Sequence, residues 1–271
     1  MSETIIKKEL FSLPEGTAYS IRITNNTGDY IDVTNYGARL LDMFVHTPSG
    51  EMKNIMCGIP SPDRAAIDSH PETILFGADL NGLSDTIWDI VEETNSSVMM
   101  TAETPSNVKA GIMITWVNLN RLILDFFVTP KEARTVRLAS CLSFDKGEYE
   151  VSSFSQEVNG LPVSDTPYSN MTFIPLKDPG DTFCSSGEDI KPMLEVKDTA
   201  SPLRISLYST MECAMARNAG DHIELTSFPK DPEELLASET LTERVICGID
   251  YITTNLASDE NDPESPFLGF F

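Results

Sequence analysis

The feature that most constrains the fold is the repeated alternation of apolar and polar residues in short segments. Segments 19-YSIRITN-25 and 134-RTVRLASCLSF-144 alternate in this way, as half-buried strands do. Two pairs of such segments predict hairpins, one across 47-TPSGE-51 and one across 119-LNRL-122. The chain therefore reads as strand after strand, joined by short turns.

Roughly a dozen predicted strands joined by Pro, Gly, Asn and Asp turns indicate an all-β fold. This number exceeds a simple immunoglobulin-type domain and predicts a large two-sheet sandwich. One helix is predicted over 231-DPEELLASETLTE-243, where Asp231 would be the cap and Pro232 the first helical residue. No linker-like composition interrupts the chain, so we expect residues 1–271 to form a single domain.

The net charge of −23 restricts the partners. Such a field repels phosphate backbones and anionic membrane surfaces, so we expect neither nucleic acid nor membrane as a partner. No run approaches the roughly 18 apolar residues of a membrane span. The sequence does not determine the oligomeric state.

The cysteines and the first residues predict a cytoplasmic location. The opening residues MSETIIKKEL lack the apolar region of a secretory signal. The five cysteines are odd in number and widely spaced, without a C-x-x-C pair. They read as reduced and mostly buried thiols.

Metal and cofactor chemistry is not expected. The three histidines, His46, His70 and His222, are scattered, and no pair has the spacing of a zinc site. No glycine-rich phosphate loop is present. The sequence predicts neither a metal nor a cofactor.

Several stretches resemble, in order, segments of the galactose mutarotase (aldose 1-epimerase) family. These stretches are 34-TNYGARLLDMFVHTPSGEMKNIMCGI-59, 77-GADLNGL-83, 84-SDTIWDIVEE-93, 118-NLNRLILDFFVTP-130 and 136-VRLASCLSFD-145. The matches cover most of the first 145 residues, and the second half matches weakly. The resemblance implies a galactose mutarotase-like β-supersandwich, with a cleft for a monosaccharide on one sheet.

The catalytic positions depart from the family pattern. In the family a Glu acts as base and a His as acid, while a second His, an Arg and an Asp hold the sugar. Here the acid His position aligns with Cys141, and the two Arg positions align with Ala78 and Gly82. The best match to the family strand that carries the catalytic Glu is 245-VICGIDY-251. This match places Ile249 at the Glu position and Asp250 one residue beyond that position. A shift of one residue on a strand points the side chain to the opposite face.

The resemblance suggests a small set of site residues. Cys141, Asp250 and Asp189 are the candidates for catalysis, and Asn81, Asp189 and Trp88 are the candidates for binding the substrate. Four of these residues have an ordinary alternative. Cys141 would be a small residue in a vacated catalytic place, Asn81 a turn residue, Trp88 a core residue and Asp250 a solvated carboxylate.

The predicted function is that of an aldose 1-epimerase-like protein that binds a monosaccharide or sugar derivative, with standard epimerase activity weak or lost. One alternative is an active isomerase that uses a different sugar and a non-standard acid–base pair. Another is a protein-interaction module built on the sandwich. Arg39 is expected to be a salt-bridging or rim residue.

Overall fold

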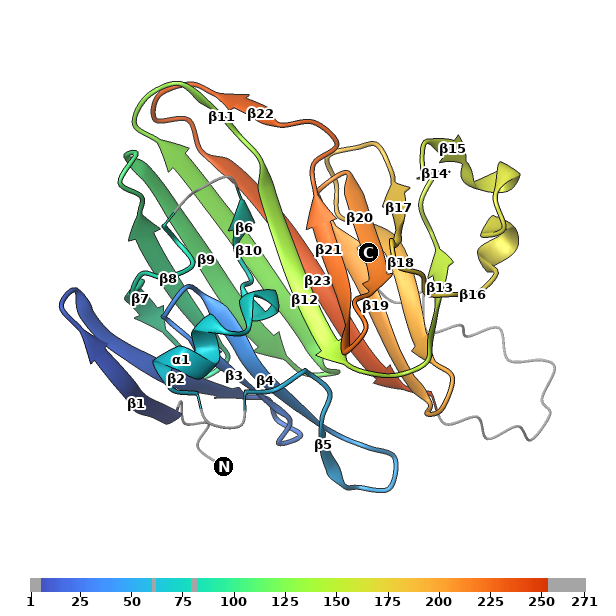
Figure 1. Ribbon diagram of the computed structural model, residues 1–271, viewed down its shortest axis with the longest axis horizontal. Coiled ribbons are helices and arrows are strands. Elements are labelled where there is room, and N and C mark those ends of the chain that lie inside the picture. Colours follow the sequence, from blue (N-terminus) through green and yellow to red (C-terminus); the bar gives the residue numbers. More distant parts are fainter. Residues whose placement is uncertain (1–5, 60–61, 79–81, 253–271) are drawn as a thin grey trace.

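The computed structural model describes residues 6–59, 62–78 and 82–252 (Figure 1). Two large antiparallel sheets pack their apolar faces against each other, and an amino-terminal sheet lies beside them. The prediction of an all-β sandwich is confirmed. Within the described ranges, no helix is long and apolar enough to cross a membrane.

The nine-stranded sheet forms one side of the sandwich. Its strands, in spatial order, are β16 (Ile174–Pro175), β13 (Tyr149–Ser153), β18 (Lys191–Asp198), β19 (Leu203–Ser209), β23 (Leu241–Tyr251), β10 (Arg121–Pro130), β9 (Val108–Val117), β8 (Ser97–Glu103) and β7 (Asp89–Glu93). Alternate residues of β10, including Leu122, Leu124 and Phe126, are buried in the core. The residues between them face away from the other large sheet, as strand periodicity requires.

The seven-stranded sheet forms the other side. Its strands, in spatial order, are β15 (Leu161–Pro162), β14 (Glu157–Val158), β17 (Asp181–Cys184), β20 (Cys213–Asn218), β21 (His222–Phe228), β12 (Leu138–Asp145) and β6 (Gly77–Ala78). Leu142, Phe144 and Leu225 point into the core between the sheets. The opposite surface of β12, β20 and β21 is here called the open face.

Smaller elements complete the molecule. The five-stranded amino-terminal sheet consists of β1 (Ile6–Leu13), β2 (Gly16–Thr24), β3 (Tyr30–Thr34), β4 (Arg39–His46) and β5 (Met52–Asn54), and β11 (Arg134–Val136) pairs with β22 (Glu233–Leu235). The helices are α1 (Arg64–Asp68) and the 3-10 turns η1 (Pro71–Thr73), η2 (Val163–Asp165) and η3 (Ser169–Met171). Helix α1 buries Ile67 with Tyr36 and Leu41 of the amino-terminal segment.

Both predicted hairpins are confirmed. Strands β4 and β5 pair across residues 47–51. Strands β9 and β10 pair across the turn residues Asn118, Leu119 and Asn120, of which the last two have φ values of 61° and 50°.

The predicted helix over 231–243 is wrong. Glu233–Leu235 instead forms β22 and pairs with β11, and β23 begins at Leu241. Ser238 has a φ of 64°, which interrupts any helix there. The local helix signals were overridden by pairing with a distant segment.

The prediction of reduced thiols is also wrong for two cysteines. Cys184 and Cys213 form a disulfide, while Cys57, Cys141 and Cys247 are free. Of the free thiols, Cys247 is buried and the other two are half-buried. The cysteines therefore no longer argue for a cytoplasmic location. That location stays a prediction from the opening residues alone.

Candidate functional site

The open face brings polar side chains from three neighbouring strands into one row. Ser143 on β12 lies directly opposite Glu224 on β21, and Glu224 lies opposite Arg217 on β20. Because residues i and i+2 of a strand share a face, Cys141 and Thr226 form the next row on the same surface. The open face is thus polar at its centre, although its other side packs on an apolar core.

Glu224 is the centre of this arrangement. Its Oε2 accepts a hydrogen bond from Arg217 Nε at 2.6 Å, and its Oε1 lies 2.9 Å from His222 Nε2. The carboxylate side chain is only 12% exposed. Burial raises the pKa of Glu224, but the hydrogen bonds from Arg217 and His222 outweigh burial and hold the pKa below its ordinary value. Glu224 is therefore a fixed carboxylate at neutral pH.

His222 lies between two carboxylates. Its Nδ1 is 2.6 Å from Asp221 Oδ1, while its Nε2 faces Glu224. An imidazole donates from both nitrogens only when it is doubly protonated. Burial lowers the pKa of His222, but the two carboxylates outweigh burial and raise the pKa. The geometry favours an imidazolium.

Cys141 lies beside this cluster as a thiol. Thr226 Oγ1 donates to its Sγ at 3.6 Å from the directly opposite position on β21. Burial raises the pKa of the Cys141 thiol to about 11. A group with such a pKa is a poor proton donor near neutral pH.

The segment around η1 covers one end of the open face. Ser143 Oγ donates to the carbonyl oxygen of Glu72 at 2.7 Å, and His70 Nδ1 lies 2.6 Å from Glu72 Oε1. Cys57 lies against β12 from the same side, with its Sγ 3.4 Å from the carbonyl oxygen of Phe144. Burial raises the pKa of Cys57 to about 12, and Glu72 is the largest charged contributor. A second histidine–carboxylate pair thus lies at the edge of the site.

Arg39 fastens this covering segment. It is 3% exposed, and its Nη1 donates to the carbonyl oxygens of Ile67 and His70 at 3.1 and 2.9 Å. Its Nη2 donates to the carbonyl oxygen of Ser84 at 3.0 Å. Arg39 forms no ion pair within the described part of the chain, so the expectation of a salt-bridging or rim residue is wrong.

The other residues named from the sequence are not brought to Cys141. Asp250 projects from the outer surface of the nine-stranded sheet, where it pairs with Arg121 at 3.1 Å. Asp189 is exposed in the loop between β17 and β18. Trp88 is fully buried, and its Nε1 donates to the carbonyl oxygen of Leu83, so it is a core residue.

Two further predicted features concern Asn81 and metals. Asn81 lies outside the described residues. Among the residues that the structure describes, no group of three or more His, Cys, Asp and Glu side chains could hold a metal ion.

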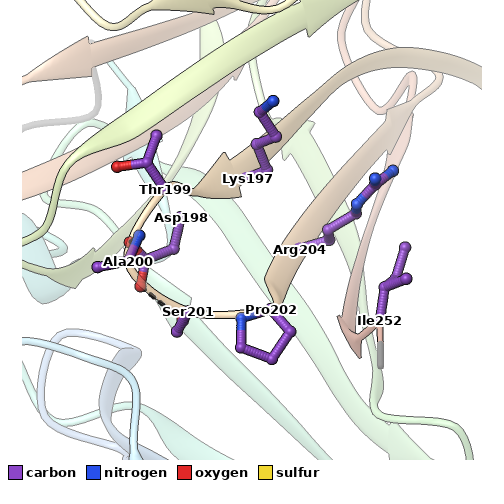
Figure 2. A pocket seen from close by; sticks show the side chains of 8 residues that line it. All are labelled: Lys197, Asp198, Thr199, Ala200, Ser201, Pro202, Arg204 and Ile252. Carbon is purple, nitrogen blue, oxygen red and sulfur yellow. Dashed lines mark hydrogen bonds between the residues drawn. The ribbon is translucent and has the colours of Figure 1, made fainter. Parts of the chain in front are cut away.

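A hollow of about 520 Å³ lies elsewhere, at the β18–β19 hairpin (Figure 2). Its two cations are already occupied, because Lys197 pairs with Glu150 and Arg204 pairs with Glu195 at 2.8 and 2.6 Å. Its carboxylate, Asp198, accepts from Ser201 Oγ within the hairpin turn, as the dashed line in Figure 2 marks. The hollow offers no unpaired charged group to a ligand.

Glu224, Arg217 and His222 were missed from the sequence. The strand 222-HIELTS-227 carried a usable signal, because its alternation places His222, Glu224 and Thr226 on one face. The sequence pattern does not show that Ser143 on β12 and Arg217 on β20 lie opposite Glu224, because only the folded sheet brings these strands together. The histidines that looked scattered in the sequence include two, His70 and His222, that border the open face.

No protein-family model and no curated protein sequence matches the chain. Solved structures do match. A GalM/aldose epimerase homologue from C. elegans has a TM-score of 0.71 and 12% identity, covering 87% of this chain and 100% of that chain. A galactose 1-epimerase from Lactobacillus acidophilus has a TM-score of 0.71 and 13% identity, covering 91% and 98%.

A galactose mutarotase-like protein from Lactobacillus casei matches with a TM-score of 0.61 and 11% identity, covering 85% of this chain and 100% of that chain. Identities this low carry the architecture and not the activity. The chain has the galactose mutarotase-like sandwich fold.

Proposed function

We propose that the protein binds a neutral monosaccharide or sugar derivative on the open face, with standard epimerase activity weak or lost. The observation that carries this proposal is the pair of Glu224 and Arg217 on neighbouring strands, with His222 beside the carboxylate. Ser143 in the same row is buried and already donates to the carbonyl oxygen of Glu72, so it supports the site from beneath the covering segment. Polar groups that converge on a scaffold of rigid strands are what recognition of sugar hydroxyls requires.

The charges of the site favour a neutral ligand. Arg217 pairs with Glu224, and His222 lies between the carboxylates of Glu224 and Asp221, so each cationic group of the site faces a carboxylate. Arg217 is 40% exposed, so its outer N–H groups are open to a hydroxyl oxygen, and Glu224 retains acceptor capacity beyond its two bonds. The net charge of −23 further disfavours phosphorylated or acidic sugars.

The same groups argue against fast epimerisation. Anomer exchange needs a base for the proton of the anomeric hydroxyl and an acid for the ring oxygen. The pKa of the Cys141 thiol is about 11, and that of Glu224 is lowered by its donors. Efficient acid–base groups have pKa values near the operating pH, and these two lie on opposite sides of it.

An active isomerase with a non-standard pair has one observation in its favour, namely the His222 imidazole that faces Glu224 and whose pKa, despite burial, is raised by its two carboxylate neighbours. In that case His222 would supply the proton that Cys141 does not. Anomer exchange above the buffer rate that disappears in His222→Gln would favour this alternative.

The test is ligand-observed NMR with a panel of neutral monosaccharides, with a sugar phosphate as the anionic comparison. Glu224→Gln is compared with Asp250→Asn, which removes a charge from the far sheet. We expect wild type and Asp250→Asn to bind a neutral sugar and Glu224→Gln to bind it about tenfold more weakly. Equal binding by both variants, or no binding by the wild type, would contradict the proposal.

A further inference from the structure

The disulfide joins two residues that face each other across the seven-stranded sheet. Cys184 ends β17 and Cys213 begins β20, and the two are paired directly in the antiparallel register with a Cα–Cα distance of 4.2 Å. They are 29 residues apart in the chain. The crosslink therefore reinforces a ladder between strands that no short turn connects.

The disulfide fastens one end of the sheet to its centre. Strands β15 and β14 reach the rest of the sheet through β17, which pairs with β20. Residues 157–184, here called the outer lobe, also carry η2, η3 and β16, and β16 pairs with β13 at the edge of the nine-stranded sheet. The lobe lies at the end of the sandwich in Figure 1. Cys213 is four residues before Arg217 on the same strand, so the disulfide and the proposed sugar site share β20.

Of the two cysteines in the disulfide, Cys184 is the one that borders a hollow. A hollow of about 100 Å³ lies beside Cys184, and its lining includes Gln156, Glu157, Ser185 and Lys230. Cys184 is half-buried, whereas Cys213 is only 2% exposed. Since exchange requires access to the attacked sulfur, the nucleophile reaches Cys184.

We propose that Cys184–Cys213 is a thiol-exchange site that takes small neutral or cationic thiols and, when reduced, releases the outer lobe from β20. An external thiolate attacks Cys184 Sγ and forms a mixed disulfide, while Cys213 leaves as a thiolate and takes a proton from water. A second thiolate attacks the external sulfur, which frees Cys184. Two external thiols thereby become one disulfide, and their two electrons reduce the protein.

The charges around the hollow select the reagent. Glu157 and Glu212 contribute two carboxylates, while Lys230 contributes one ammonium, whose Nζ lies 3.4 Å from Glu157 Oε2. The hollow is therefore net negative within a protein of net charge −23. An anionic thiol is repelled at low ionic strength, and this repulsion is screened by salt.

The first experiment counts thiols in the full chain by maleimide labelling and intact mass after air oxidation. We expect Cys57, Cys141 and Cys247 to be labelled after denaturation and two more sites to appear only after reduction. Five labelled sites without a reductant would overturn the proposal.

The second experiment compares cysteamine, 2-mercaptoethanol and 2-mercaptoethanesulfonate, with rates expressed per thiolate. We expect reduction of the folded protein in that order, with differences of several-fold at low salt that narrow at high salt. Equal rates for the three thiols at low salt, or reduction only under denaturing conditions, would contradict the proposed exchange site.

The third experiment is hydrogen exchange of the oxidised and reduced wild-type protein. We expect faster exchange after reduction in the outer lobe and in residues 213–217, with Cys184→Ser resembling the reduced protein and ignoring reductant. Cys141→Ser is the matched control and should respond like the wild type. Unchanged hydrogen exchange of the outer lobe after reduction would refute the proposal that the disulfide holds this lobe against β20. Because no sugar is used, the result does not depend on the proposed function.

Discussion

Arg217 Nε donates to Glu224 Oε2 at 2.6 Å from the directly opposite position on the neighbouring strand. The pair lies on the outward surface of the seven-stranded sheet, where β20 is the strand next to β17 of the outer lobe. Two paired strands hold Arg217 and Glu224 in fixed positions without a loop, as a binding site requires.

Removing the guanidinium should weaken both the site and the sheet. In Arg217→Met the Glu224 carboxylate keeps only His222 as a donor, so we expect a loss of about 1–2 kcal/mol in the free energy of unfolding. Sugar affinity should fall about tenfold. Urea denaturation and NMR titration measure the two effects, and Arg121→Met, which breaks the ion pair with Asp250 on the far sheet, should leave affinity unchanged.

The stability of the protein should depend on pH through His222. The pKa of His222 in the folded protein is raised above 6.5, the ordinary value for histidine. The histidine's contribution is therefore complete below about pH 6 and is lost as pH rises through the folded pKa. We expect the free energy of unfolding of the wild type to decline as the pH rises from about 6 through the folded pKa of His222, and to decline less in His222→Gln. Identical pH profiles for the two proteins would contradict the assignment.

Cys141 should be chemically quiet in the folded protein. Because burial raises the pKa of its thiol to about 11, the thiolate is scarce at pH 8 and alkylation should be at least about tenfold slower than for an ordinary thiol with a pKa near 8.5. Iodoacetamide labelling followed by peptide mass spectrometry measures the rate. Labelling at the rate of an unfolded control would show that the thiol is freely ionised.

Placing a histidine at this position should create activity. In Cys141→His an imidazole would lie one row from Glu224, and a positioned general acid contributes about 10²–10⁴ in rate. We expect anomer exchange to rise at least about tenfold above the wild-type rate, with Cys141→Ala showing no gain. An inactive Cys141→His that folds and still binds sugar would show that the thiol is not what limits exchange.

Arg39 should be a major contributor to stability. In Arg39→Met the carbonyl oxygens of Ile67, His70 and Ser84 lose the guanidinium as a donor, although Ile67 and His70 keep the backbone N–H donors of the same segment. We expect the free energy of unfolding to fall by about 3 kcal/mol. Arg39→Lys should recover part of this loss, since an ammonium reaches fewer of these oxygens. A loss below 1 kcal/mol for Arg39→Met would contradict this role.

Local patterns in the sequence predicted the strands and the tight turns. The hairpin at Leu119 and Asn120 follows from residues that lie next to each other in the chain, so its signal is local. The segment 231–243 failed for the converse reason. Its helix signals are local, whereas its partner strand β11 lies far away in the sequence.

The site is non-local in the same sense. Ser143, Glu224 and Arg217 come from three strands, and no spacing in the chain announces their row. A match based on residue type at one strand led to Asp250, which the fold places on the far sheet. The disulfide escaped prediction because Cys184 and Cys213 meet only through the register of β17 and β20.

The sugar site is tested most directly by one NMR sample series in which binding and anomer exchange of a neutral sugar are observed together for the wild type and Glu224→Gln. We expect the wild type to bind the sugar and the variant to bind it about tenfold more weakly, with exchange at the buffer rate in both. Absence of binding by the wild type, or binding that ignores the loss of the Glu224 charge, would contradict a sugar site on the open face.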